Sequence, residues 1–369
     1  MPRVDDTELD KMMASLATQA PKEPSSMTEP VISVPRASPL ARRPVPNLHP
    51  EHPPGAQLVS SSLRSPTTAA PPRGELAWPP AFGEHADQNK RHRRHMEDAP
   101  KVVPDLVDGE YAYFAIYDGH GGRTAVDFIS DRLHENVASE LQSTADACRE
   151  DVNVVSAAIS RAVMRTDDQL KPAGAYGCGS TAAIIVLQRL PACAAASPGG
   201  QTPRVLAFAA NAGDSHIMLL GRTPPGVPPP APVRLSVEHS GKNEEEVARV
   251  LGAGGFMRRG RVGCLLAVTR ALGDHALKED ESGVGLTAEP NVCVHEVDAA
   301  ADLGFLLVSD GVTEALDDEA CDAIAREALA KGDGGPAGAQ LVAKAVVEGA
   351  VERGSRDNIS AVFVHLAPA

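Results

Sequence analysis

The 369-residue chain has few aromatic residues, no excess of basic residues and no long apolar run. Aromatic residues make up only 3% of it, so any core must be built mainly from aliphatic side chains. Its 35 Lys and Arg residues face 49 Asp and Glu residues, and this net charge of -14 argues against a general nucleic-acid-binding protein. No apolar run approaches the about 20 residues that cross a bilayer, and the N-terminal residues do not resemble a signal peptide. We therefore expect a soluble, non-secreted protein of the cytoplasm or nucleus, with no nucleic-acid or membrane partner.

Cysteine is also sparse. The six cysteines form no C-x2-C pair and have no histidine at a spacing typical of zinc sites. We interpret them as free thiols in a reducing compartment.

The first part of the chain is rich in proline. Sixteen of the 31 prolines precede residue 81, and no helical or strand period persists there. We predict a disordered tail over residues 1–80 and a folded domain over residues 81–369. Within the tail, Ser38 and Ser65 precede prolines as in phosphorylation sites, and Arg42-Arg43 resembles a docking peptide, although such short matches also arise by chance.

The pattern of apolar residues predicts an α+β fold. Strand-length apolar runs alternate with turn residues, and four stretches have helical spacing. Two hairpins are expected, one through the loop 191–203 and one turning at 212–214, and the helices are grouped in pairs. The predicted strands are 111–117, 181–187, 205–210, 217–220, 265–268, 305–308 and 359–364, and the predicted helices cover 129–141, 155–163, 318–329 and 339–352.

Apolar strands repeatedly run into an aspartate followed by glycine. Asp118 and Asp310 both stand in such Asp-Gly pairs, and Asp214 and Asp357 follow or precede other strands. A carboxylate at a strand end is held rigidly, and oxygen ligands favour Mg²⁺ or Mn²⁺ over Zn²⁺. A single Asp-Gly pair is usually only a turn, but four acidic strand ends in one domain predict a cation site.

The segment RRHMED, residues 93–98, precedes the first of these strands. If it is extended, Arg93 lies on the same side as Glu97, and Asp98 points the other way. A guanidinium beside a metal cluster suits a phosphate dianion. The run KRHRR that overlaps this segment also allows a nuclear-import signal or a solvated strand edge.

Other phosphate chemistries fit less well. Cys264 and Arg270 have the C-x5-R spacing of cysteine-dependent phosphatases, but the residues between them are apolar and contain no glycine to form a phosphate cradle. The sequence has no phosphate-binding GxxxxGK[ST] loop and no G-x-S-x-G elbow.

Eight sequence blocks in order resemble the metal-dependent PPM (type 2C) serine/threonine protein phosphatases. The resemblance covers about residues 84–366 and consists of RRHMED, YDGHGG, CGSTAA, NAGDSH, EEEVARVLGAGG, LAVTRALGD, LLVSDG and GSRDNISAV. It implies a four-layer sandwich, with two antiparallel β-sheets flanked by helix pairs and the metals between the sheets at one end. It also implies that residues 81–369 are a phosphatase domain that acts on phosphorylated proteins, and we expect a monomer.

The resemblance also implies roles for single residues. Asp118 matches the carboxylate that bridges two Mg²⁺ or Mn²⁺ ions, with the Gly119 carbonyl, Asp310 and Asp357 completing their inner shell. The other matches are Glu97 and Asp98 to acids that hold metal-bound waters, Arg93 to the phosphate-binding arginine, His120 to the general acid, and Asp214 and Glu314 to ligands of a weaker third ion.

Three positions depart from the family pattern. His216 replaces an arginine, Gly263-Cys264 replaces Asn-Gly, and Glu314 replaces an aspartate. None of them is a predicted ligand of the metal pair. The expected reaction is hydrolysis of phosphoserine and phosphothreonine by a metal-activated water, without a covalent intermediate. A pseudophosphatase that only binds, and a phosphatase of small phosphate esters, are the alternatives.

Overall fold

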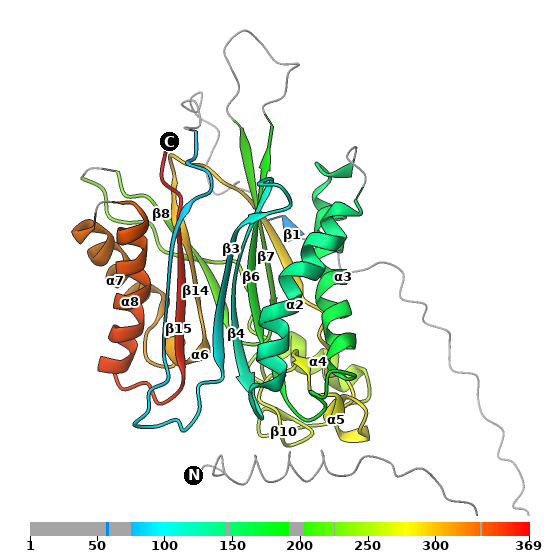
Figure 1. Cartoon of the computed structure of the whole chain (residues 1–369). Helices are drawn as coiled ribbons and strands as arrows, with labels where there is room; N and C mark the ends of the chain where they lie inside the picture. The colour runs from blue at the N-terminus through cyan, green and yellow to red at the C-terminus, as the bar shows by residue number, and fades with distance from the viewer. Residues whose placement is uncertain (1–56, 59–74, 145–147, 192–202, 225, 333) are drawn as a thin grey trace, which may run out of the picture.

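Strand β4 (Tyr111–His120) has a different apolar core on each of its faces. Its tyrosines lie on the side of helices α2 (Arg123–Gln142) and α3 (Val152–Leu170). Phe114 points to the opposite side, because successive side chains of a strand alternate, and joins a cluster that includes Phe305. β4 therefore lies inside a layered structure (Figure 1).

The computed structural model describes residues 57–58, 75–144, 148–191, 203–224, 226–332 and 334–369. The features that the sequence suggests around Ser38, Arg42 and Ser65 lie outside these residues.

The strands of the two sheets are β1 (Gln57–Leu58), β2 (Ala81–Asp87), β3 (Asp98–Leu106), β4, β5 (Gly179–Ser180), β6 (Ala182–Leu190), β7 (Arg204–Ala212), β8 (His216–Gly221), β9 (Val233–Arg234), β12 (Leu272–Gly273), β13 (Asn291–Glu296), β14 (Asp302–Val308) and β15 (Ile359–His365). Within the described residues, the first sheet has the order β1-β13-β7-β6-β4-β5-β12, and β3 also pairs with β4. The second sheet has the order β2-β15-β14-β8-β9. Pairing within the sheets is antiparallel except between β1 and β13.

A helix pair covers the outer face of each sheet. Helices α2 and α3 pack on the first sheet, and α7 (Asp318–Lys331) and α8 (Pro336–Glu352) pack on the second. A third cluster fills the space between the sheets. The order helix pair, sheet, sheet, helix pair confirms the predicted α+β sandwich (Figure 1).

Smaller elements complete one end of the molecule. They are α4 (Glu244–Gly252), the hairpin of β10 (Met257–Arg258) and β11 (Arg261–Val262), α5 (His275–Lys278), a 3-10 turn (Glu281–Gly283) and α6 (Asp310–Thr313). In the part of the chain that the structure describes, no helix combines the length and apolarity needed to cross a membrane.

The strand predicted at 265–268 is wrong. These residues form a turn with isolated bridges, because the chain reverses at Gly263 and Cys264, whose φ angles are 58° and 65°, and the N–H groups of Leu265 and Leu266 donate to the carbonyl oxygen of Val262. Their apolar side chains fill a separate small cluster beneath α4. The apolar residues at 265–268 correctly indicated burial, but their predicted secondary structure was wrong.

The second predicted hairpin is also wrong. The turn at residues 212–214 does not return the chain to β7, because it carries the chain from β7 in the first sheet to β8 in the second. The neighbours of β7 are β6 and β13, so neither of its edges is open to β8.

Some strands were not predicted from the sequence. β3 contains two prolines, and its residues do not alternate regularly between apolar and polar. The prolines are tolerated because β3 is an edge strand, whose only strand partner in the described residues is β4. β2 is likewise an edge strand with polar residues.

The packed region begins before residue 81. Leu76 is 7% exposed and belongs to the core between the sheets, and Trp78 donates a hydrogen bond from Nε1 to the carbonyl oxygen of Gly109 at 2.8 Å. The backbone N–H of Ala77 donates to the carbonyl of Ala367. Residues 76–78 therefore contact the folded domain.

Candidate active site

Acidic residues from five separate segments meet at one end of the two sheets. Asp118 lies near the C-terminal end of β4, and Asp98 begins β3. Asp310 begins α6 at the end of β14, Asp357 precedes β15, and Asp214 lies in the turn between β7 and β8. The end of β4 and helix α6 mark this end in the lower half of Figure 1.

Asp98 and Asp118 stand directly opposite each other in the β3–β4 ladder. Burial raises the pKa of Asp118 well above its ordinary value, and the charges of Asp310 and Asp98 raise it further. Burial likewise raises the pKa of Asp98 to about 6. Like charges held opposite each other in a sheet are destabilising, so this pairing is unfavourable without a counter-charge.

Asp310 and Asp214 belong to the same electrostatic group. Burial raises the pKa of Asp310 well above its ordinary value, followed by repulsion from Asp214 and Asp357. Burial raises the pKa of Asp214 to about 6. Buried carboxylate oxygens that accept no hydrogen bond include Oδ2 of Asp98 and Oδ1 of Asp310.

This donor set suits hard divalent cations. Several carboxylates raise each other's pKa, and buried oxygens among them lack protein donors, as expected where cations provide the missing partners. The described residues nevertheless include no three His, Cys, Asp or Glu side chains already arranged as a metal-binding group. The side chains thus share an environment without forming a ready-made coordination cage.

The glycine of the second Asp-Gly pair brings two of these segments together. A Cβ atom at Gly311 would lie 2.0 Å from the carbonyl oxygen of Asn358 and 3.2 Å from Cβ of Asp357. No other residue fits there without a backbone shift. Gly311 therefore allows α6, with Asp310 at its start, to lie against Asp357.

The first Asp-Gly pair is fixed by hydrogen bonds. The backbone N–H of Gly119 donates to the carbonyl oxygen of Glu97 at 3.1 Å, and the Thr181 N–H donates to the carbonyl oxygen of Asp118 at 2.9 Å. Oε1 of Glu97 accepts a bond of 2.7 Å from the Gly122 N–H at the start of α2. These bonds orient the main chain of the YDGHGG block.

The chain turns at Arg94 and His95 and β3 begins only at Asp98, so residues 93–97 do not form the extended segment that the sequence analysis considered. The Arg93 guanidinium forms an ion pair with Asp357, and the two side chains are 33% and 19% exposed. Asn358, which the sequence analysis did not select, holds this turn in place. Its Oδ1 accepts from the Glu97 N–H, and its Nδ2 donates to the carbonyl of His95.

His120 is paired with a residue that the sequence analysis also missed. Its Nε2 lies 2.7 Å from Oδ2 of Asp274, a fully buried residue. Burial lowers the pKa of His120, but the Asp274 carboxylate outweighs it, so that the pKa is raised above 6.5. Asp274 ends the LAVTRALGD block, which was the available signal for it.

Glu314 is exposed and follows the last residue of α6. The next helix, α7, has Asp317 as its N-cap, whose side chain accepts a hydrogen bond from the N–H of Ala320. The charge of Asp214 raises the pKa of both Asp118 and Asp310. Asp214, one of the two predicted third-ion ligands, therefore belongs to the carboxylate group.

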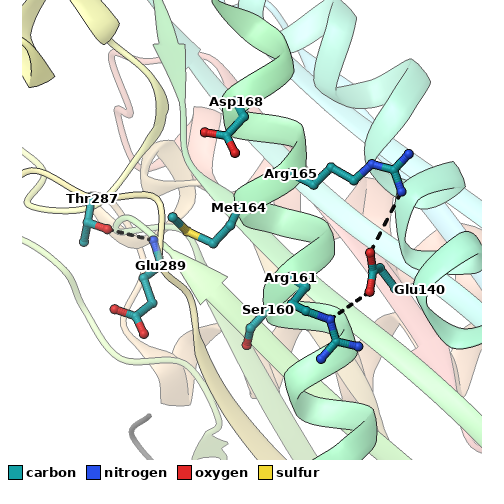
Figure 2. A pocket seen from close by; sticks show the side chains of 8 residues that line it. All are labelled: Glu140, Ser160, Arg161, Met164, Arg165, Asp168, Thr287 and Glu289. Carbon is teal, nitrogen blue, oxygen red and sulfur yellow. Dashed lines mark hydrogen bonds and ion pairs between the residues drawn. The ribbon is translucent and has the colours of Figure 1, made fainter. Parts of the chain in front are cut away.

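The cavity shown in Figure 2 is a separate feature. It has a volume of about 440 Å³ and lies between α2, α3 and residues 287–289. Arg161 and Arg165 on its wall both form ion pairs with Glu140. Its lining contains none of the predicted site residues.

A sequence model of the family described as protein phosphatase 2C matches residues 82–359. The chain belongs to the protein phosphatase 2C family. Protein phosphatase 2C homolog 1 of Schizosaccharomyces pombe is 29% identical to it over 284 residues, which cover 76% of this chain and 71% of that protein. The Saccharomyces cerevisiae protein of the same name is 29% identical over 291 residues, covering 77% and 92%.

Solved structures have the same fold. A crystal structure of serine-threonine phosphatase 2C from Toxoplasma gondii aligns with a TM-score of 0.60 and 22% identity, covering 82% of this chain and 99% of that one. A C. elegans sex determining protein aligns with a TM-score of 0.62 and 22% identity, covering 78% and 65%. As a protein phosphatase 2C, the chain is a serine/threonine protein phosphatase, a phosphoric monoester hydrolase.

The structure also removes the cysteine alternative for this protein phosphatase 2C. Arg270 is 9% exposed and forms an ion pair of 2.7 Å with Glu246, so its guanidinium is already engaged. Cys264 is exposed at the positive-φ turn.

His216, another departure from the family pattern, is buried beside Arg234, and burial lowers its pKa to about 4.

Proposed function

We propose that this protein phosphatase 2C hydrolyses phosphoserine and phosphothreonine in proteins in a reaction that requires Mg²⁺ or Mn²⁺. The observation that carries the metal requirement is the group of mutually repelling aspartates at the end of the sheets. A phosphate dianion cannot approach such a group unless its negative charge is reversed.

The proposed ligands of two ions are Asp118, the Gly119 carbonyl, Asp310 and Asp357, with Glu97 and Asp98 around them. When bound, the ions would supply positive charge for the phosphate and lower the pKa of the attacking water. The buried oxygens of Asp98 and Asp310 without protein donors support this assignment.

Arg93 is the proposed phosphate-binding residue. A guanidinium offers a planar set of donors that matches phosphate oxygens. Its ion pair with Asp357 supports this role, because the pair holds the guanidinium at the edge of the carboxylate group. In the proposed role, Arg93 would contact the phosphate from this position.

His120 is the proposed general acid. Its imidazole lies two residues after Asp118 on the same strand, and it can donate a proton to the serine or threonine oxygen as that oxygen leaves. The role predicts a dependence on the leaving group: His120→Ala should slow hydrolysis of a phosphothreonine peptide by about 10²-fold or more but should affect p-nitrophenyl phosphate much less. Equal losses on the two substrates would contradict proton transfer by His120.

Asp214 and Glu314 are the proposed ligands of a weaker third ion. The inclusion of Asp214 in the carboxylate group supports the first assignment, and Glu314 would need to contact the ion through water. The rate should then keep rising at millimolar Mn²⁺, and Asp214→Ala should remove this late rise. A single saturating metal dependence in both proteins would contradict a third ion.

One experiment separates the proposed function from its alternatives. The full chain is assayed with p-nitrophenyl phosphate and with a phosphothreonine peptide, each with Mn²⁺ and with a chelator. Metal-dependent turnover of both substrates is expected. Turnover of p-nitrophenyl phosphate alone would favour a phosphatase of small esters, and no turnover of either would favour a pseudophosphatase.

A further inference from the structure

His120, Gly179 and Gly273 form one continuous rung across three strands. His120 on β4 stands opposite Gly179 on β5, and Gly179 stands opposite Gly273 on β12. Asp274 follows Gly273 directly. The backbones of His120 and Asp274 are therefore separated by two strand spacings of about 5 Å each. The two residues can touch only if a side chain crosses the strand between them.

The missing side chain of Gly179 makes this crossing possible. A Cβ atom on Gly179 would lie 2.2 Å from Oδ2, 2.6 Å from Cγ and 2.8 Å from Oδ1 of Asp274. The carboxylate thus occupies the space that any other residue at position 179 would fill. From there, its Oδ2 reaches Nε2 of His120 at 2.7 Å.

Asp274 is held rigidly in this unusual place. Its φ angle is 52°, in the left-handed region that residues other than glycine rarely adopt. Its backbone N–H donates to the carbonyl oxygen of Cys178 at 2.9 Å, and its carbonyl accepts from the N–H groups of Leu277 and Lys278. The backbone therefore fixes the direction of the carboxylate.

Helix α3 supports the residues on both sides of Asp274. Oδ1 of Asp167 accepts a hydrogen bond of 2.6 Å from the Gly273 N–H, and both oxygens of Asp167 lie 2.8 Å from Nζ of Lys278. Lys278 and Asp167 are both largely buried. This ion pair fastens the turn that contains Asp274 to a long helix of the core.

The conformation and burial of Asp274 destabilise the folded protein, so stability does not explain them. The residue is 0% exposed, and its Oδ1 has no hydrogen-bond partner in the described structure. Burying a carboxylate with half of its acceptors unused costs free energy, and the left-handed backbone adds to that cost. The consequence of this arrangement is that the carboxylate holds Nε2 of the His120 ring in a fixed position.

We propose that Asp274 is the positioning residue of His120, with its carboxylate reaching across Gly179 to hold the imidazole in the orientation needed for proton transfer to the leaving oxygen. This inference rests on the general-acid role of His120 in the proposed function. Asp274 itself contacts neither the substrate nor the reacting atoms. It acts by limiting the rotation of the ring, which otherwise has two free side-chain torsions.

The test compares Asp274→Ala, Asp274→Asn and Gly179→Ala with His120→Ala. Asp274→Ala should lower kcat on a phosphothreonine peptide by about 10- to 100-fold, within the range of general-acid catalysis, and by less than about threefold on p-nitrophenyl phosphate. Asp274→Asn should keep most activity, because its amide oxygen still accepts a bond from Nε2. Gly179→Ala should resemble Asp274→Ala, because its methyl group displaces an intact carboxylate.

A double-mutant cycle gives an independent measure of the pair. If Asp274 acts only through His120, the double variant should be no slower on the phosphopeptide than His120→Ala alone. An additional loss of tenfold in the double variant would overturn the proposal. Equal losses on both substrates in Asp274→Ala and Gly179→Ala would also overturn it, because general structural damage slows both reactions.

Asp302→Ala is the matched control for loss of a buried carboxylate. Asp302 is 7% exposed, and its Oδ2 lies 2.7 Å from Nε2 of His295, so this pair repeats the geometry away from the carboxylate group. The control variant should lose thermal stability and should change both substrate rates by the same factor. Selective loss on the phosphopeptide in this control would mean that the leaving-group readout does not report on His120.

A measurement without turnover separates this proposal from the proposed function. Nitrogen-15 spectra recorded at a pH where the His120 ring is neutral should show the ring of the wild type as the tautomer protonated at Nε2, and Asp274→Ala should change this to a mixture. An unchanged tautomer would overturn the proposal even in an active enzyme. A wild type that turns over neither substrate but shows the Nε2 tautomer would refute the proposed function and leave the hydrogen bond established without a catalytic role.

Discussion

Asp98→Asn should stabilise the metal-free protein at neutral pH. Asp98 is 3% exposed, and burial raises its pKa from 3.8 to about 6. Because the pKa is higher in the folded chain, ionisation of Asp98 opposes folding. This cost is absent below about pH 3.8, grows between pH 3.8 and 6, and is complete above about pH 6.

The size of the effect follows from the same two pKa values. The interval from 3.8 to about 6 corresponds to about 3 kcal/mol, since one pH unit is worth about 1.4 kcal/mol. An asparagine has nearly the same shape and no charge, and the buried Ser360 hydroxyl beside Asp98 can accept a hydrogen bond from the new amide. We expect a gain of up to about 3 kcal/mol at pH 7.5, or roughly 5 to 10 °C in Tm, and almost none near pH 4.

The assay is thermal and urea unfolding in chelator at several pH values. Asp131→Asn is the control, because it removes an exposed aspartate from α2. Adding Mn²⁺ should stabilise the wild type by about 2.7 kcal/mol at 100 times the dissociation constant, and should stabilise Asp98→Asn less. If Asp98→Asn destabilises the chelated protein at pH 7.5, or has the same effect at pH 4 as at pH 7.5, the electrostatic reasoning is refuted.

Three further predictions concern the site and the domain boundary. Asp118→Asn should abolish turnover at any practical Mn²⁺ concentration, since an amide is a much weaker ligand for a divalent cation than a carboxylate; steady-state rates within tenfold of the wild type would contradict the assignment. Arg93→Lys should raise KM for a phosphopeptide about tenfold or more, because a point charge replaces a planar pair of donors, and an unchanged KM would exclude phosphate binding. Deletion of residues 1–56 should leave Tm and the peptide rate unchanged. Deletion of residues 1–80 should lower the free energy of unfolding by about 2 to 5 kcal/mol, because it removes buried Leu76. Equal Tm values for the two truncations would show that Leu76 does not contribute to stability.

The sequence by itself determined most of the helices and strands of this protein and the residue types at their ends. Strand and helix periods are local properties, so the apolar runs predicted β4, β6, β7, β14 and β15 and both helix pairs. The bounds of the first pair were too short, because α2 begins at Arg123 and α3 continues to Leu170. The acidic residues at strand ends were also visible as a local pattern, and their oxygen atoms indicated the class of cation. Local patterns could not show edge strands such as β3, whose prolines disguise it.

Only the tertiary structure decided which of these pieces meet. The turn at residues 212–214 passes between sheets because the neighbours of β7 are other strands, a choice that no local pattern records. Asp274 lies 154 residues from His120 in the chain, and their contact depends on three strands in register and on the absence of one methyl group at Gly179. Such pairings depend on register and backbone direction, which packing of the whole chain sets.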